Sequence, residues 1–377
     1  MHIFRIPIRI TLAAAGMLAA LLLTGCWDDA EINGRAFVLG FRADGGEEGY
    51  QFTFQLAIPV SGESDSSGSI LYDARTVTGD TPAAAVRTLE KDLGRQINFE
   101  QLSLIVIGED LSQRNFTGLT DYFFRRASVR RQSCIAVCAG SAGAFFGHSA
   151  AGRAISTEAA SALQSYDAGG GIAMNLFSLY KALVNRDEFF LPRISAEGEG
   201  EGSQLAISGA AAYGREGEYR GEAGGEELEL LRLTRGSGIG GSLSVKDGQG
   251  NLYCCEVRQS DCSVKCRINN GVPAFRIHLE LVIIPLDTRG EGGGEYSDGR
   301  LRAISEEAGQ SVRERLEALA LRSRESLGSS VLGLQDIIRQ RQPDWYGLHE
   351  KEWEKFFRKS EIEITVNCTV AGGGLTK

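Results

Sequence analysis

Residues 101–111, QLSLIVIGEDL, constrain the fold of this 377-residue chain most, because the centre of the segment is continuously apolar. A short apolar run of this kind is typical of a strand that is buried on both faces. The segment 119–127, LTDYFFRRA, then reads as a helix, and 131–140, RQSCIAVCAG, reads as a second buried strand. Strand, helix and strand in this order predict a βαβ-like unit inside a mixed sheet.

The chain before this unit predicts a hairpin and a helix. Residues 35–60 alternate apolar and polar side chains around a glycine-rich turn, which indicates two antiparallel strands. A polar loop at 61–69 follows. Residues 81–97 predict a helix with Thr81 as its N-cap and Pro82 at its first position.

The chain after this unit predicts a helix, a linker, a series of hairpins, a long helix and a final strand. Residues 175–194 predict a further helix, and the acidic, glycine-rich segment 196–204 predicts a linker. Hairpins are expected over about 205–287, then a long amphipathic helix at 300–323, and a returning strand at 360–370. The apolar face of the long helix consists of Leu301, Ile304, Ala308, Val312, Leu316 and Leu319.

These elements predict an α+β fold with mixed sheets, packed helices, a hairpin-rich second half and a long C-terminal amphipathic helix. We expect a signal segment at 1–25, an N-terminal α/β domain at 26–195 and a C-terminal α+β region at 205–377. The last region would contain a hairpin lobe at about 205–287 and a helix-plus-strand lobe at about 300–371.

The N-terminus carries the pattern of a bacterial lipoprotein signal. Arg5 and Arg9 come before fourteen uncharged residues at 10–23, which is too short for a membrane-spanning helix of ~20 residues. The bacterial lipobox pattern LTGC follows, formed by Leu23, Thr24, Gly25 and Cys26. The sulfur of Cys26 would take a diacylglyceryl group and begin the mature chain, a disulfide or a core thiol being the alternatives. Two acyl chains hold a protein stably on a membrane.

Charge limits the partners of the chain. Removal of residues 1–25 deletes Arg5 and Arg9 and no acidic residue, so the formal charge of −9 becomes −11. An acidic body is not expected to bind nucleic acid, and an anionic membrane repels it unless a partner holds it. We therefore expect a protein that docks on other proteins.

The sequence contains only weak signals for catalysis or for a cofactor. The GSGIGG segment at 236–241 matches a dinucleotide-binding pattern, but a strand follows it instead of a helix, so we interpret it as a loop. SLYK at 178–181 matches S-x-x-K inside a helix whose apolar spacing already explains it as a packing element. His148, His278 and His349 are far apart in sequence. We expect neither an enzyme nor a cofactor.

The cysteines favour structural roles over a metal site. Cys254, Cys255, Cys262 and Cys266 lack the C-x-x-C spacing of zinc knuckles, so buried thiols or one cross-strand disulfide are favoured over a metal. Cys134 and Cys138 share one face of a buried strand.

Several segments resemble the Ger(x)C family of spore germination lipoproteins. GCWDDAEINGRAFVLGF at 25–41 is similar to the family's G-C-W-D-x-x-E-I opening, and Trp27, Asp28, Glu31 and Ile32 supply its motif. The segments 102–131, 176–194 and 207–233 resemble, in order, its strand followed by a Phe-rich helix, its helix before Leu-Pro, and its hairpin followed by a Glu-containing strand. The segment 331–357 resembles its C-terminal part with paired tryptophans, here Trp345 and Trp353.

This resemblance implies a non-enzymatic subunit of a nutrient germinant receptor, lipid-anchored on the outer side of the spore inner membrane beside two polytopic subunits. The chain departs from the family pattern at Arg126 and Ser128, where acids are usual, and at Ser330, where Asp is usual. A change from acid to Arg reverses the local charge at a surface that could contact partners.

The alternative function is a lipid-anchored solute-binding protein of a transporter. That class requires two doubly wound parallel lobes around a ligand cleft, and the hairpin-rich second half argues against it.

Overall fold

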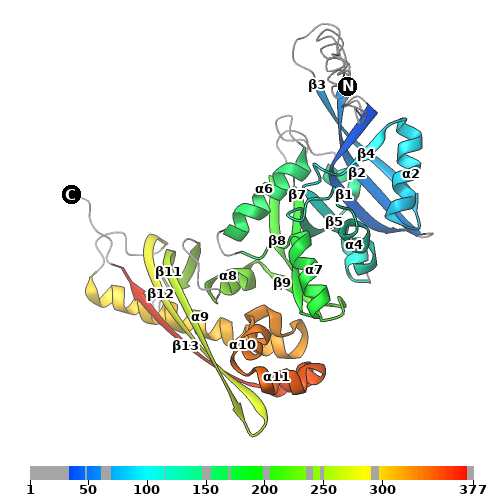
Figure 1. Ribbon diagram of the computed structural model, residues 1–377. Helices are drawn as coiled ribbons and strands as arrows, with labels where there is room; N and C mark the ends of the chain where they lie inside the picture. Colours follow the sequence, from blue (N-terminus) through cyan, green and yellow to red (C-terminus); the bar gives the residue numbers. More distant parts are fainter. Residues whose placement is uncertain are drawn as a thin grey trace, which may run out of the picture.

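The computed structural model describes residues 34–46, 49–60, 69–114, 116–146, 154–168, 171–197, 204–234, 241–246, 250–289 and 297–371. Figure 1 shows two lobes, one built mainly from the N-terminal half and one from the C-terminal half of the chain. Each lobe contains one sheet, and the described strands form a nine-stranded and a four-stranded sheet.

The larger sheet is mixed, and its central strands are parallel. Its path is β3-β2-β1-β5-β6-β7-β8-β9, and β4 pairs with β1. The strands at both ends are antiparallel, while β1, β5, β6 and β7 run parallel to one another. The bounds are β1 Arg35–Gly46, β2 Gly49–Val60, β3 Ser69–Gly79, β4 Gln96–Asn98, β5 Leu104–Gly108, β6 Cys134–Cys138, β7 Phe189–Glu197, β8 Gln204–Tyr213 and β9 Tyr219–Gly224.

The predicted βαβ unit is confirmed. β5 and β6 are buried along their whole length and pair in parallel, and α4 (Thr117–Phe124) lies between them in sequence. The predicted hairpin is confirmed as β1 and β2, which pair from Phe37↔Ala57 to Gly46↔Gly49. Thr81 caps α2 (Pro82–Leu93) by accepting a hydrogen bond from the backbone N–H of Ala84.

Helices cover both faces of the larger sheet. Side chains of α2, α4 and α7 (Leu176–Asn185) pack with β1, β2 and β5 in one core cluster on one face. On the other face, α5 (Ala142–Phe146) and α6 (Ile155–Ala168) pack against residues of β5 and β6. The central strands are therefore apolar on both sides, as parallel strands between two helical layers must be.

The region 175–197 is a helix followed by a strand, where the sequence predicts a helix alone over 175–194. α7 ends where Arg186 adopts a left-handed conformation with φ of 53°. β7 then begins at Phe189 and pairs with β6 and β8.

The predicted linker lies between two neighbouring strands of one sheet. β7 and β8, on either side of it, pair antiparallel as far as Glu197↔Gln204. β9 is the last strand of the larger sheet along the chain, and the smaller sheet begins with β10. The division of the chain into domains at 195 and 205 remains a prediction.

The smaller sheet has the order β10-β11-β12-β13, and β13 returns parallel to β12. Its strands are β10 Ser242–Lys246, β11 Leu252–Asn269, β12 Val272–Arg289 and β13 Glu361–Val370. Asn270 and Gly271, with φ of 50° and 79°, form the two-residue turn between β11 and β12. An Asn-Gly turn with two positive φ angles matches the twist of a long hairpin.

Helices of the second half pack against this sheet. The long helix α9 (Asp298–Arg322) buries the predicted face from Ile304 to Leu319, although Leu301 is only half-buried.

The segment before β10 is a helix, α8 (Gly225–Thr234), so the prediction of a strand there is wrong. Leu228, Leu230, Leu231 and Leu233 of α8 are buried between the two lobes' strands, and that burial outweighs any strand preference. The remaining helical elements are η3 Ser323–Leu327, η4 Ser329–Leu332, α10 Leu334–Arg341, α11 Pro343–His349, η5 Glu350–Glu352 and α12 Trp353–Lys359.

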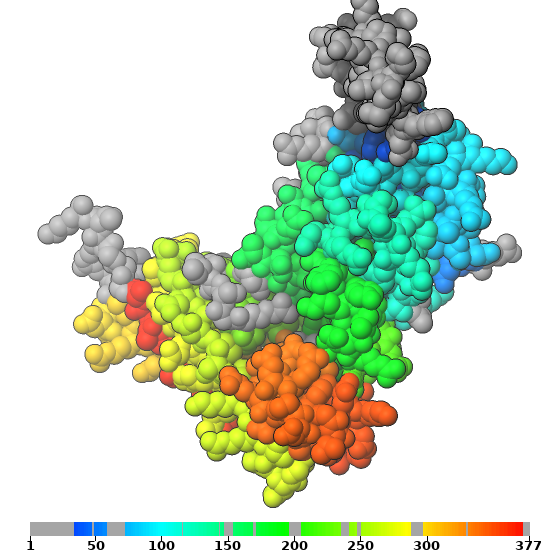
Figure 2. Space-filling model, in the orientation of Figure 1, coloured from blue at the N-terminus to red at the C-terminus, as the bar shows by residue number. Residues whose placement is uncertain are grey.

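The core is continuous between the lobes. Ala210 and Ala212 of β8 belong to the same buried cluster as residues of β11, β12 and α9. Figure 2 shows the residues of α10–α12, in orange, packed directly against green residues of the N-terminal lobe.

Candidate functional site

The predicted attachment site lies outside the described residues. This applies to the lipobox residues Leu23, Thr24, Gly25 and Cys26, and to the motif residues Trp27, Asp28, Glu31 and Ile32. Their roles remain predictions. The structure does describe the point at which the chain leaves this segment and enters the fold, which is the start of β1 at Arg35.

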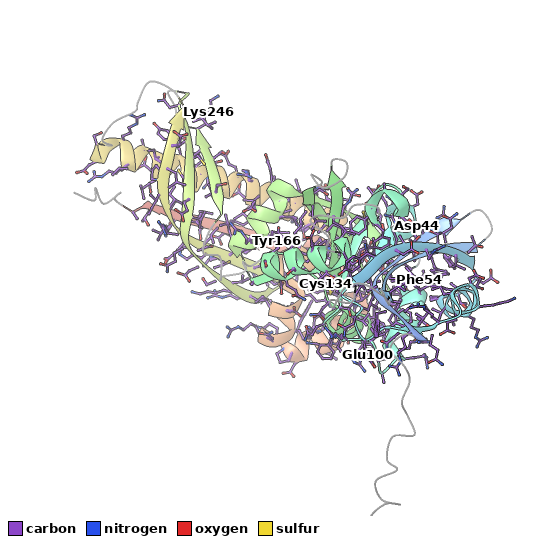
Figure 3. The ribbon with its side chains drawn as sticks, turned by 90° about the horizontal axis from the view of Figure 1, so that it is seen from above. Asp44, Phe54, Glu100, Cys134, Tyr166 and Lys246 are labelled. Atoms are coloured by element: carbon purple, nitrogen blue, oxygen red, sulfur yellow. The ribbon has the colours of Figure 1, made fainter. Side chains whose placement is uncertain are left out.

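The start of β1 lies at the amino edge of the parallel strands. Arg35 pairs with Gln96 of β4, and the backbone N–H of Ser103, just before β5, donates to the carbonyl of Leu39 at 2.9 Å. The N–H of Cys134 donates to the Ser103 carbonyl, which brings the start of β6 to the same edge. In Figure 3, Glu100 marks this edge and Asp44, near the end of β1, marks the opposite one.

A cavity of about 620 Å³ lies where the two lobes meet. Ser178 and Lys181 of α7 line one side, Cys262 and Val264 of β11 another. Three acidic side chains also line it. Asp187 and Glu188 come from the loop before β7, and Asp336 comes from α10. Arg339 binds Asp187 at 2.7 Å and also donates to Asp336, so part of this acidic charge is neutralised. The polar and charged lining of the cavity would suit a small polar molecule. The two lobes around it, however, are not the two doubly wound parallel lobes that a solute-binding protein requires.

Ion pairs join the lobes beside this cavity. Arg220 of β9 donates two hydrogen bonds to the carboxylate of Glu354 on α12, at 2.7 and 2.9 Å. The hydrogen bond from Arg220 lowers the pKa of Glu354 to about 2, and Arg358 acts in the same direction. Arg215, in the turn after β8, binds Glu350 at 2.8 Å. This geometry fixes the C-terminal helices on the edge of the larger sheet.

A second polar cluster lies at the carboxyl edge of the parallel strands, which is the edge opposite the start of β1. Arg193 of β7 donates to Glu222 of β9 and to Glu109, which begins α3 (Glu109–Ser112) directly after β5. The hydroxyl of Tyr219 donates to Glu222 at 3.2 Å, and burial together with this carboxylate raises the pKa of Tyr219 to about 12. One guanidinium therefore bridges two carboxylates, which joins β7 to β9 and to the start of α3.

The cysteines of the described chain are free thiols. Burial raises the pKa of Cys134 and Cys255 to about 11 and that of Cys368 to about 12. Cys254 is exposed while Cys255 is buried, as expected for neighbours on opposite faces of a strand. Among the residues that the structure describes, no group of three or more His, Cys, Asp or Glu side chains could hold a metal ion.

The weak catalytic motifs do not come together in the described chain. His278 on β12 contacts Thr365 and Glu280, whereas His349 stacks on Trp345 with ring centroids 4.4 Å apart. Ser178 donates its backbone N–H to the N-cap Asn175, and the ammonium of Lys181 lies 5.7 Å from the ring centre of Phe177. His148 and most of the GSGIGG segment lie outside the described residues.

The positions that carried the family resemblance in the C-terminal lobe are structural. Trp353 is fully buried and contacts Tyr346 and Phe357 through its ring.

Arg126 of the N-terminal lobe, which departs from the family pattern, places its guanidinium 4.7 Å from the ring centre of Tyr122 and 5.2 Å from that of Phe99. This substitution therefore has a packing role at the amino edge of the sheet.

None of the helices within the described residues is both long and apolar enough to cross a membrane.

Comparisons with known proteins agree with this architecture. Residues 28–196 match the protein-family model described as spore germination protein N-terminal domain. Residues 208–374 match the one described as spore germination B3/GerAC like, C-terminal. The chain is 22% identical to spore germination protein B3 of Bacillus subtilis (strain 168) over 360 residues, which covers 94% of this chain and 95% of that protein. It is 23% identical to spore germination protein A3 of the same organism over 271 residues, 69% of each chain.

The fold is similar to the crystal structure of the GerBC protein. The TM-score is 0.56 at 18% sequence identity, and the match covers 88% of this chain and 96% of that one. The α+β fold class predicted from the sequence is thereby confirmed.

Proposed function

Because the chain belongs to the Ger(x)C family of spore germination proteins, the C subunits of germinant receptors, we propose that it is the lipid-anchored, non-catalytic subunit of one nutrient germinant receptor. In this proposal a diacylglyceryl group on Cys26 holds the protein on the outer side of the spore inner membrane. The body assembles there with polytopic membrane subunits and helps to convert nutrient binding into germination.

The observation that carries the proposal is the agreement between the N-terminal sequence and both halves of the fold. The lipobox directly precedes the family's opening motif, and the two family models account for residues 28–196 and 208–374. A non-catalytic role is supported by the position of the two described histidines, since neither His278 nor His349 lines the cavity between the lobes.

The anchor is tested by Cys26→Ala in the native host. We expect the variant protein to leave the membrane fraction of spores and to be lost or soluble, with germination on nutrients strongly slowed. Cys254→Ala, which removes an exposed thiol from the C-terminal lobe, is the matched control and should leave both properties unchanged. Full membrane retention and normal germination of the Cys26 variant would contradict the anchor.

A further inference from the structure

One helix of the N-terminal lobe is apolar on both of its sides. The inner face of α7 is formed by Leu176, Leu179 and Ala182, which are buried. On its outer side, Phe177 is 46% exposed, Tyr180 41% and Val184 62%. The fold covers this outer side only in part, because the ring of Tyr180 packs edge-on against that of Phe124, with centroids 5.1 Å apart, while Phe177 and Val184 are exposed.

Cations lie beside the N-terminal end of this helix. The segment 125–131, RRASVRR, contains four arginines and no acid, in a chain whose formal charge is −9. Its backbone meets α7 directly, since the N–H of Phe177 donates to the carbonyl of Arg131 at 3.0 Å. Arg130 and Arg131 are exposed, and Lys181 lies on α7 itself, beside Phe177.

The acids nearby cancel this charge only in part. Lys181 lines the cavity between the lobes together with Asp187, Glu188 and Asp336, whereas Arg130 and Arg131 do not line that cavity. Asp121 is bound by Arg125 at 2.6 Å, and the side chain of Arg130 donates to the amide oxygen of Gln101. Glu100 remains as an exposed carboxylate on the loop before β5. We name the group Phe177, Tyr180, Lys181, Val184, Arg130 and Arg131 the α7 surface.

The α7 surface lies on the edge of the sheet at which the N-terminal segment enters. The N–H of Leu176 donates to the carbonyl of Ser133, just before β6, so α7 starts at the amino edge of the parallel strands. Arg35, the first residue of β1, lies beyond this edge on the same side of the sheet, because Gly40 and not Arg35 is level with the starts of β5 and β6. From Cys26 to Arg35 the chain can span at most ~30 Å, so an anchor at Cys26 keeps the start of β1 within that distance of the lipid.

We propose that the α7 surface rests on the anionic phospholipid headgroups of the membrane to which the chain is anchored, and so fixes the orientation of an otherwise acidic body. Aromatic side chains with exposed Lys and Arg beside them are the combination that suits the membrane–water interface. The inference rests on the proposed membrane attachment, and it adds a second contact that holds one particular face of the protein towards the lipid.

The test uses the mature chain with Cys26→Ser, which carries no acyl chain, so it does not depend on the anchor. We expect this protein to sediment with vesicles of phosphatidylglycerol and phosphatidylcholine, to do so less as salt is raised, and not to sediment with phosphatidylcholine alone. Arg131→Gln with Lys181→Gln should weaken the partition about 25-fold, at about fivefold for each cation removed. Phe177→Ser with Tyr180→Ser should weaken it as well.

The matched control is Lys265→Gln with Arg267→Gln, which removes two exposed cations from β11 near the far turn of the long hairpin and should change nothing. Equal partition of the parent protein and both α7 variants would overturn the proposal, and so would the absence of any binding to anionic vesicles. Binding of the parent protein to detergent-solubilised receptor subunits, lost in the α7 variants while vesicle binding is absent, would also overturn it and assign the surface to a protein partner.

Discussion

At the scale of single residues, burial decides how each cysteine of this chain reacts. Cys254 is exposed, whereas Cys134 and Cys255 are buried and burial raises the pKa of both thiols to about 11. Because the thiolate is the species that reacts, these two buried groups are almost unreactive at neutral pH.

We therefore predict that iodoacetamide at pH 7 labels Cys254 first in the native Cys26→Ser protein. Mass spectrometry of the peptides should show Cys134 and Cys255 labelled only after urea is added. Cys254→Ser should remove the fast phase of labelling. Comparable labelling rates for Cys134 and Cys254 in the native protein would contradict this assignment of burial.

Arg126 shows the limit of reading single residues from a family pattern. The sequence comparison indicated a reversed charge at a surface that could contact partners, but the structure shows the guanidinium over the rings of Tyr122 and Phe99. The sequence alone carries no information on which aromatic rings lie beside a given Arg, because Phe99 and Arg126 belong to different elements.

At the scale of secondary structure, the two sides of α7 should contribute differently to stability. Leu179 is fully buried, so Leu179→Ala should lower the free energy of unfolding by about 2–5 kcal/mol. Val184 is 62% exposed, so Val184→Ala should change it by less than about 0.5 kcal/mol. Urea unfolding followed by circular dichroism measures both. A large loss for Val184→Ala would mean that the outer side of α7 is covered by the fold itself, and would remove the basis of the α7 surface.

The elements that the sequence predicted well are those with a local signal. Thr81 and Pro82 mark the start of α2, and the continuous apolar run at β5 marks a central strand. The strand β7 was missed because it follows α7 after only three residues. α8 was expected as a strand because its glutamates and leucines fit either structure, and only its burial between the lobes decides for a helix.

The candidate surface was missed for a related reason. The apolar residues of α7 were all interpreted as packing residues, although the apolar residues of LFSLYKALV extend over more of the helix than one buried face needs and RRASVRR is an unusual run in an acidic chain. Both signals were present in the sequence. Their juxtaposition depends on the parallel order of β1, β5 and β6, which a single sequence does not specify.

At the scale of the whole molecule, charged pairs contribute to the contact between the lobes. The pKa of Glu354 is lowered from 4.5 to about 2 by Arg220 and Arg358, so its stabilising effect is complete above about pH 4.5 and is lost as the pH falls towards 2. Its side chain is 42% exposed, and solvent screening limits the effect to about 1 kcal/mol.

Glu354→Gln should therefore destabilise the protein at pH 7, and the difference from the parent should shrink as the pH approaches 2. Urea unfolding at a series of pH values measures this. Glu352→Gln is the matched control, since Glu352 is 57% exposed and forms its ion pair with Lys355, three residues along the same helical segment. A pH-independent difference for Glu354→Gln would show that the pair across the lobes is not the cause.

The most direct test of the central claim is to tag this protein in its own host, cross-link spores mildly, and identify what co-purifies from the spore membranes. The account predicts two polytopic germination subunits, recovered from spores and not from growing cells. Recovery of a transporter permease from growing cells, without germination subunits, would contradict the account and favour a solute-binding role.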